Sequence, residues 1–327
     1  MTQATDLHVT ANGLAPGSES KRNAAAPRTV KPSGVHNNLF YWLGGMALVA
    51  NKLRHQLRGY KTPRPFAVSQ TERAAQYDIA VVQQWLEALR RYAGRDLSFR
   101  DRTVLELGPG ADLGVGLVLL SRGTRTYHAL DVANLAPQAP PALYDELLDQ
   151  LDGQVIDYAL LWSELDAARA GHGRRLNFVW DPLFDVRAFA GLDIDLVVSQ
   201  AAFEHFENPG KVIAQLTSVV TPGAILVSEI DLQTHSRWLR EADPLNIYRF
   251  SDRVYNALRF TGSPNRWRPA EYVDALRRHG WRDIEVTPIT ILDDAYLSRV
   301  RPSLNPQYRS HQNQMEILHF VICARKA

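Results

Sequence analysis

The stretch that decides the fold is Glu106-Leu-Gly-Pro-Gly-Ala-Asp-Leu-Gly114, which follows the apolar segment 103–107. Glycines between a strand and a helix let the backbone approach a ligand closely, because no Cβ stands in the way. The dinucleotide fingerprint G-x-G-x-x-G would need glycine at 113, where the chain has leucine. A carboxylate just before the loop also disfavours a pyrophosphate. It suits a cationic ligand that carries an amino group.

Strands and helices alternate on both sides of this loop. Predicted strands are 103–107, 124–130, 176–180, 194–199 and 224–229, and predicted helices between them include 113–121, 142–151, 159–170 and 208–220. This alternation predicts a Rossmann-like, doubly wound, mostly parallel α/β sheet. Two later strands, 283–290 and 316–324, flank a segment without a clear helix. They bring the expected sheet to seven strands, with an antiparallel last strand at its edge.

Three sequence features at the ends of predicted strands together resemble a known protein family. Asp131 ends the second strand, where a carboxylate can accept two hydrogen bonds from a ribose diol. With the glycine loop and the run D-L-V-V-S-Q-A-A-F-E-H-F at 195–206, the chain resembles a class I S-adenosylmethionine-dependent methyltransferase of the type-11 kind. The resemblance covers about residues 100–229. It implies S-adenosyl-L-methionine as the cofactor and the sheet order of that family.

The resemblance also implies roles for single residues. Glu106 and the loop Gly108-Pro109-Gly110 would hold the methionine end of the cofactor. Asp131 would bind the ribose, and Asp181 would lie near the adenine amine. The backbone of Ser199, Gln200 and Ala201 would line the cofactor. Structural alternatives stay open: the glycines can form a plain turn, Asp131 can cap its strand, and Asp181-Pro-Leu-Phe can start a turn.

Two histidines are candidates for proton transfer to or from the acceptor. His205 follows the fourth strand at the ligand side, and histidine titrates near neutral pH, so His205 is the first candidate base. The alternative is a structural or cofactor-lid role. His235, after the fifth strand, is the second candidate. No histidine or cysteine cluster has zinc spacing, so no metal is expected.

The segment 248–268 mixes arginines with aromatic residues, a combination that can hold a sugar or a phosphorylated glycan. Its candidate substrate-binding residues are Arg259, Arg266 and Trp267. The alternative is that these arginines cover a solvated helix face. Because 232–268 follows a strand's carboxyl end, we expect it to be an insertion on the substrate side of the sheet.

Composition and charge complete the domain plan. The 327 residues are 45% hydrophobic, which suits a large globular domain. Residues 1–34 lack large apolar groups and are expected to be a disordered tail. Residues 35–95 are expected to be a helical extension or lid, and 96–327 the methyltransferase domain.

The N-terminal arm differs from the rest of the chain in charge. The whole chain has a formal net charge of +2, whereas residues 1–60 alone carry a charge of +5. The remaining residues are therefore mildly acidic, which disfavours nucleic acid as a partner. Residues 39–61 combine an aromatic, apolar first half with a basic second half, and we expect either a lid or a peripheral contact with an anionic membrane. With Cys323 as the only cysteine, a cytoplasmic protein is expected.

The predicted function is methyl transfer from S-adenosylmethionine to a small-molecule or glycan acceptor, at oxygen. Three alternatives remain open: an NAD-dependent oxidoreductase, an RNA methyltransferase, and a non-catalytic module that binds S-adenosylmethionine. The identity of the acceptor and the oligomeric state do not follow from the sequence.

Overall fold

The computed structural model describes residues 26–34, 36–58, 70–151 and 157–327. Its centre is a single sheet with the strand order β1-β7-β8-β6-β5-β2-β3-β4. The strands are β1 (Arg28–Val30), β2 (Thr103–Leu107), β3 (Thr126–Asp131), β4 (Leu176–Trp180), β5 (Ile194–Gln200), β6 (Val220–Asp231), β7 (Trp281–Leu292) and β8 (Ile317–Lys326). Strand β8 runs antiparallel to both of its neighbours, and the other pairs are parallel.

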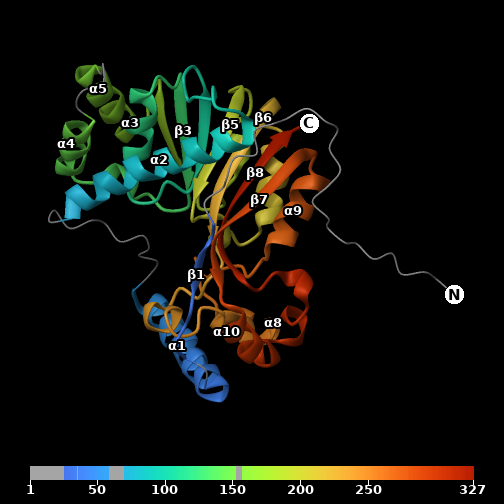
Figure 1. Cartoon of the computed structure of the whole chain (residues 1–327). Helices are drawn as coiled ribbons and strands as arrows, with labels where there is room; N and C mark the ends of the chain where they lie inside the picture. Colours follow the sequence, from blue (N-terminus) through green and yellow to red (C-terminus); the bar gives the residue numbers. More distant parts are fainter. Residues whose placement is uncertain (1–25, 35, 59–69, 152–156) are drawn as a thin grey trace, which may run out of the picture.

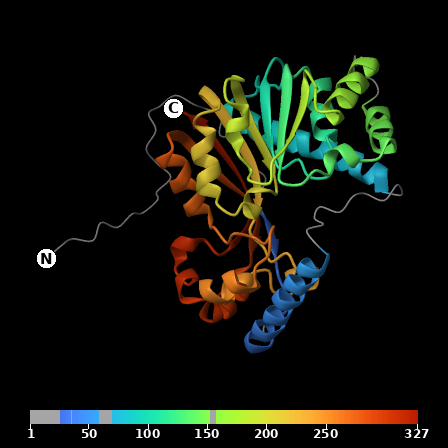
Figure 2. The same ribbon diagram turned by 180° about the vertical axis from the view of Figure 1, so that it is seen from behind.

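Helices cover both faces of this sheet. They are α1 (Asn37–Arg58), α2 (Thr71–Ala93), α3 (Gly114–Ser121), α4 (Pro141–Gln150), α5 (Tyr158–Arg169), α6 (Pro209–Leu216), α7 (Arg237–Arg240), α8 (Asp252–Leu258), α9 (Pro269–Arg278) and α10 (Asp294–Val300). Helix α2 crosses one face, beside α3, α4 and α5 (Figure 1). Helices α6 and α9, yellow and orange in the view from behind, cover the other face (Figure 2).

The strand periodicity explains the two cores. Successive side chains of a strand point to opposite faces, so Val104 packs into the core under α2 and Leu105 into the core under α6 and α9. Both are fully buried. Each such side chain contributes about 1.5–3 kcal/mol relative to leaving it exposed. These two layers hold the carboxyl ends of β2, β3 and β5 side by side, where the site lies.

A third core forms a lobe beside the sheet, and Figure 1 shows α1, α8 and α10 gathered there. It combines Leu48 of α1 with residues from 245–255 and 292–318. Asn246 Nδ2 donates to Phe40 O of α1 at 2.8 Å, and the rings of Tyr41 and Phe250 lie 5.0 Å apart. Helix α1 therefore packs on the inserted segment.

The strands and antiparallel β8 confirm the predicted mostly parallel sheet, but the sheet has eight strands instead of seven, and β8 lies between β6 and β7 instead of at the edge. Three further segments also differ from expectation. Residues 28–30 form β1, which pairs with the exposed edge of β7, although the tail was predicted to be disordered through residue 34. Helix α2 packs into the main core, with Trp85 1% exposed, although residues 35–95 were expected to form an extension or lid. The segment between β7 and β8 contains α10. Residues 1–25 lie outside the described part of the chain.

None of the helices in the described segments is both long and apolar enough to span a bilayer.

Candidate cofactor and acceptor site

The glycine loop begins where β2 ends, between β3 and β5 in the sheet. Gly108 and Gly110 have φ values of 78° and 85°, the left-handed region that favours glycine. A Cβ on Gly108 would lie 2.6 Å from the Cβ of Ala202. The loop thus needs glycine both for its conformation and for its close approach to the segment after β5. Pro109 lies between them and is partly exposed.

Asp131 ends β3 beside this loop. Its Oδ2 accepts a hydrogen bond from Gly110 N–H at 3.1 Å, and its Oδ1 accepts one from Ala133 N–H at 2.8 Å. Burial raises the pKa of Asp131 to about 6, against the opposing effect of these backbone donors. Each carboxylate oxygen keeps a second lone pair, so the side chain can bind a ribose diol while it also orders the loop.

Three buried carboxylates surround the start of α3, and we call Asp78, Glu106 and Asp112 the loop acids. Glu106 Oε2 accepts a hydrogen bond from Tyr127 Oη at 2.5 Å. Burial raises the pKa of Glu106 to about 8. Burial and mutual proximity also raise the pKa of Asp78, and burial raises that of Asp112. At pH 7 and without a ligand Glu106 therefore holds a proton, and a nearby cation favours the ionised forms of all three loop acids.

Sequence reasoning missed Asp78 and the role of Asp112. Asp78 lies on α2 among the buried positions Ala74, Ala75, Val81 and Val82. A charged residue on the apolar face of an amphipathic helix was the available signal. A Cβ on Gly114 would lie 2.0 Å from Asp78 Oδ2, so Gly114 is needed for the close approach of α2 to the loop.

The segment after β5 forms the other side of the loop. Ser199 Oγ donates to Leu107 O at 2.8 Å, which ties the end of β5 to β2. Gln200 Oε1 accepts from Trp85 Nε1 at 3.1 Å, and Ala201 has a left-handed φ of 48°. The structure therefore brings the backbone of residues 199–201 against the glycine loop.

Asp181 follows β4, and its side chain caps a turn. Its Oδ1 accepts from Leu183 N–H at 2.9 Å and its Oδ2 from Asp185 N–H at 2.8 Å. Its own N–H donates to Asp131 O at 3.0 Å, which places it next to the ribose candidate. The hydrogen bonds of the Asp181 side chain are those of a turn, which was the structural alternative. Contact between Asp181 and adenine stays a prediction.

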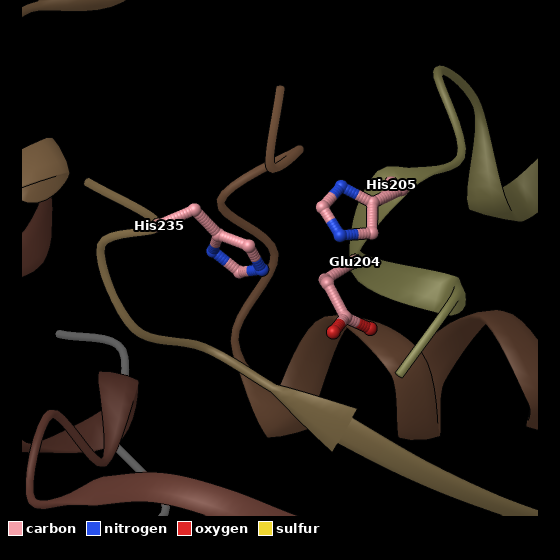
Figure 3. Close-up of side chains that lie close together, drawn as sticks. All are labelled: Glu204, His205 and His235. Carbon is pink, nitrogen blue, oxygen red and sulfur yellow. The ribbon is translucent and has the colours of Figure 1, made fainter. Parts of the chain in front are cut away.

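The two histidines predicted to transfer protons lie in the turn Phe203–His205 and in the loop after β6. His205 Nδ1 lies 2.6 Å from Gly262 O, and His235 Nδ1 lies 2.9 Å from Gln233 O. The two rings are 4.7 Å apart, edge to face. Figure 3 shows His235 across from the adjacent pair Glu204 and His205. Asn265 Nδ2 donates to Phe203 O and Phe206 O, which holds the turn in place.

Burial decides the protonation of these histidines. It lowers the pKa of His205 to about 4, with a further contribution from His235, and it also lowers the pKa of His235. Both imidazoles therefore favour the neutral form at pH 7, and the pKa of His205 lies below the value near neutral pH that is ordinary for histidine. Glu204 is buried, its Oε1 accepts from Asp231 N–H at 3.3 Å, and its Oε2 has no hydrogen-bond partner among the described residues. An unpartnered buried acceptor costs about 1–3 kcal/mol.

The residues predicted to bind the substrate differ in their exposure. Arg266 is 5% exposed, and its guanidinium donates to Ile247 O, Phe250 O and Asp252 while it lies over the Tyr255 ring. Trp267 packs into the core beside Tyr272. The contacts of both side chains are packing contacts within the lobe and the core, so a solvated helix face does not describe them, and a part in substrate binding stays a prediction. Of the three candidates, Arg259, exposed at the end of α8, keeps an accessible charge.

No family model matches the sequence, and no curated protein matches it. The chain is similar to solved structures of low identity. One is the CurJ carbon methyltransferase, at 15% identity, covering 87% of this chain and 67% of that one, with a TM-score of 0.43. Another is an S-adenosylmethionine-dependent methyltransferase from Mesorhizobium loti, at 14% identity, covering 74% and 96%, with a TM-score of 0.40. A third is phosphoethanolamine N-methyltransferase 2 of Haemonchus contortus in complex with S-adenosyl-L-methionine, at 15% identity, covering 75% and 52%, with a TM-score of 0.40.

The strand order itself identifies the architecture. Apart from β1, the sheet runs β7-β8-β6-β5-β2-β3-β4, with the last strand of the chain inserted antiparallel between β6 and β7. This is the order that the sequence resemblance implied, and the glycine loop lies after its central strand β2. The chain has the class I methyltransferase fold.

Proposed function

We propose that this protein transfers a methyl group from S-adenosylmethionine to a hydroxyl oxygen of a small-molecule or glycan acceptor. The observation that carries the proposal is the arrangement at the ends of β2, β3 and β5. There the glycine loop, Asp131 and the backbone of 199–201 meet, and Gly110 N–H is bonded to Asp131 itself. A ribose carboxylate and a close backbone approach thus lie in one place.

The loop acids favour S-adenosylmethionine over a dinucleotide. Two of them, Asp78 and Asp112, lie against the start of α3, where a dinucleotide would place its pyrophosphate. Ionised carboxylates repel phosphate, whereas they attract the sulfonium and ammonium groups of S-adenosylmethionine. Leucine at position 113 removes the third glycine that a dinucleotide site uses. These features count against the NAD-dependent alternative.

The acceptor is proposed to lie beside His205 and His235, over the carboxyl ends of β5 and β6. The hydroxyl oxygen attacks the methyl carbon, the carbon–oxygen bond forms, and the carbon–sulfur bond breaks with its electron pair on sulfur. S-adenosylhomocysteine leaves, and the hydroxyl proton needs an acceptor. Because His205 Nδ1 faces a carbonyl, its neutral ring keeps a lone pair on Nε2 that can receive this proton. Alignment of the two reactants supplies much of the rate.

Calorimetry of the full-length protein with S-adenosylmethionine and with NAD tests the cofactor. We expect binding of S-adenosylmethionine, and binding of NAD alone would reject the proposal. Turnover on a panel of hydroxyl compounds, glycans and RNA then separates an enzyme from a binding module. Methylation of RNA alone would replace the small-molecule acceptor with a nucleic acid.

We also propose that α1 brings the enzyme to an anionic membrane surface. Six large apolar side chains recur at every third or fourth position and face solvent: Leu39, Trp42, Met46, Val49, Leu53 and Leu57. We call them the α1 stripe. Trp42 is 69% and Leu57 85% exposed, so the stripe does not pack as a lid. Helix α1 contains no acidic residue and three basic ones, a pattern typical of interfacial helices.

A further inference from the structure

Three potential metal-ligating side chains converge on the acceptor side of the site. Glu204, His205 and His235 each offer one ligand atom, and these atoms all lie within 4.8 Å of one another. Two of the residues are neighbours after β5 and the third comes 30 positions later, after β6. Figure 3 shows the side chains gathered from these two segments. The sequence predicted no metal because no local spacing links them.

The hydrogen bonds of the two histidines orient them as ligands. A backbone carbonyl only accepts, so His205 Nδ1–H donates to Gly262 O and His235 Nδ1–H donates to Gln233 O. In a neutral imidazole, the lone pair is then on Nε2. Metal-ligating histidines nearly always donate their second ring N–H to a carbonyl or carboxylate in this way. Both rings are therefore held in the tautomer that a metal ion requires.

The buried carboxylate of Glu204 is a second, independent observation that points to a ligand. Its side chain is 1% exposed, and Oε2 has no hydrogen-bond partner in the described segments. Its Oε1 accepts a long bond from Asp231 N–H, at 3.3 Å. Buried carboxylates are ordinarily paired with a donor or a cation. A cation bound beside the two neutral imidazoles would supply the partner that Oε2 lacks among the described residues.

We propose that Glu204, His205 and His235 bind one divalent transition-metal ion, with zinc as the best-fitting ion. Two imidazoles and one carboxylate are a common set for a catalytic zinc ion, which keeps an open fourth position. In a tetrahedral site, ligand atoms bonded to zinc at about 2.0–2.2 Å lie about 3.3–3.6 Å apart, so binding draws together those ligand atoms that are up to 4.8 Å apart in the ion-free structure. The three residues follow the carboxyl ends of β5 and β6, where the acceptor is proposed to bind.

The part of this ion in catalysis rests on the proposed function. A hydroxyl oxygen bound to the open position has a lowered pKa, so its proton leaves to solvent and the oxygen attacks the methyl carbon. The ion would then replace the free Nε2 of His205 as the group that activates the hydroxyl. Ion binding itself does not depend on methyl transfer.

The test is zinc binding by the full-length protein after removal of metals with EDTA. Zinc affinity is measured in competition with a chromophoric chelator, and zinc content after gel filtration. We expect one ion per chain. Glu204→Gln and His235→Ala should each weaken binding by at least about tenfold. The matched control is His172→Ala, an exposed histidine outside the cluster, which should bind as the wild type does.

Cobalt(II) gives a second readout, because a four- or five-coordinate site with two imidazoles produces visible absorption bands. These bands should be present in the wild type and in His172→Ala and absent in the Glu204 and His235 variants. Melting temperatures of all variants show whether they are folded. No zinc uptake by the wild type, or equal affinity in the folded Glu204→Gln variant, would overturn the proposal.

Two further outcomes separate this proposal from the proposed function. A protein that binds zinc but not S-adenosylmethionine keeps the metal site and loses the methyltransferase function. A metal-free protein that binds S-adenosylmethionine and methylates its acceptor at an unchanged rate refutes the part of the ion in catalysis, whereas the metal site itself is judged by the zinc titration. In that case the imidazole of His205 acts as the base.

Discussion

At the residue scale, Asp131 is proposed to serve both the loop and the ribose. Asp131→Ala removes an acceptor of charge-assisted hydrogen bonds, and such bonds contribute about 1.5–3 kcal/mol. We expect the Kd for S-adenosylmethionine to rise at least about tenfold, as measured by calorimetry. Asp166→Ala, on the exposed side of α5, is the control. An unchanged Kd would remove Asp131 from the cofactor site.

The same carboxyl predicts how cofactor affinity depends on pH. The pKa of Asp131 is raised to about 6 by burial, and only its ionised form accepts fully from a diol. Affinity should therefore fall as pH decreases through about 6, and the loop acids add to the dependence in the same direction. In calorimetry between pH 5 and 8, the Kd for S-adenosylmethionine should depend less on pH for Asp131→Asn than for the wild type. Equal slopes would contradict the assignment.

Glu106 predicts a pH dependence of stability in the cofactor-free protein. Burial raises its pKa from the ordinary glutamate value of 4.5 to about 8, so the folded protein holds a proton that the unfolded chain releases between these values. The free energy of unfolding should fall as pH rises through this window. Glu106→Gln removes this contribution, so its stability relative to the wild type should increase from pH 5 to pH 8. Urea unfolding at pH 5 and pH 8 measures the free energy of unfolding of both proteins. If the difference between them is the same at both pH values, Glu106 is not protonated in the folded protein.

At the element scale, the α1 stripe predicts binding to anionic vesicles. The double variant Trp42→Ser/Leu57→Ser removes two of its most exposed members, each contributing about 1.5–3 kcal/mol when buried in lipid. We expect its partitioning into phosphatidylglycerol vesicles to fall at least about tenfold in a sedimentation assay. Leu183→Ser is the control, because Leu183 is 77% exposed but lies after β4.

Two results would contradict membrane binding by α1. Equal pelleting of the wild type and the double variant would show that the stripe does not contact lipid. Concentration-dependent dimerisation that the double variant abolishes, in a protein that does not bind vesicles, would show that the stripe is an interface between two copies. Analytical ultracentrifugation distinguishes this case.

At the scale of the whole molecule, one buried carboxylate joins the segments of the lobe. Asp243 accepts hydrogen bonds from Arg249 Nε at 2.8 Å, Asn246 Nδ2 at 2.8 Å and Tyr296 Oη at 2.7 Å. Arg249 in turn donates to Asn37 of α1 at 3.1 Å. The inserted segment, α10 and α1 therefore share one polar network.

Arg249→Met should destabilise this network strongly. It leaves a fully buried carboxylate without its cation, which costs about 3–5 kcal/mol. The control is Arg187→Met, because the exposed pair of Arg187 with Asp185 contributes only about 0–1 kcal/mol. Urea unfolding gives the stability, and hydrogen exchange should show lost protection in α1, α8 and α10. A loss below about 1 kcal/mol would contradict a central role for the network.

The sequence by itself determined the parts of this protein that depend on neighbouring residues. The apolar runs of β2 to β6, the glycine loop and the carboxylate at 131 follow from short-range periodicity and turn chemistry, and all appear where they were predicted. The antiparallel direction of β8 was predicted from its connection to β7, but its place between β6 and β7 was not, since periodicity alone does not order strands within a sheet.

Only the tertiary structure decided which distant residues meet. Strand β1 has three residues of a polar tail and exists because the edge of β7 supplies hydrogen-bond partners. Arg266 looked like a ligand-binding residue because a sequence does not show the carbonyls and rings that enclose it. Asp78 meets the glycine loop, and His235 meets Glu204, through packing of segments far apart in the chain. Such contacts form only after the core has offset their loop-closure entropy, so no local pattern records them.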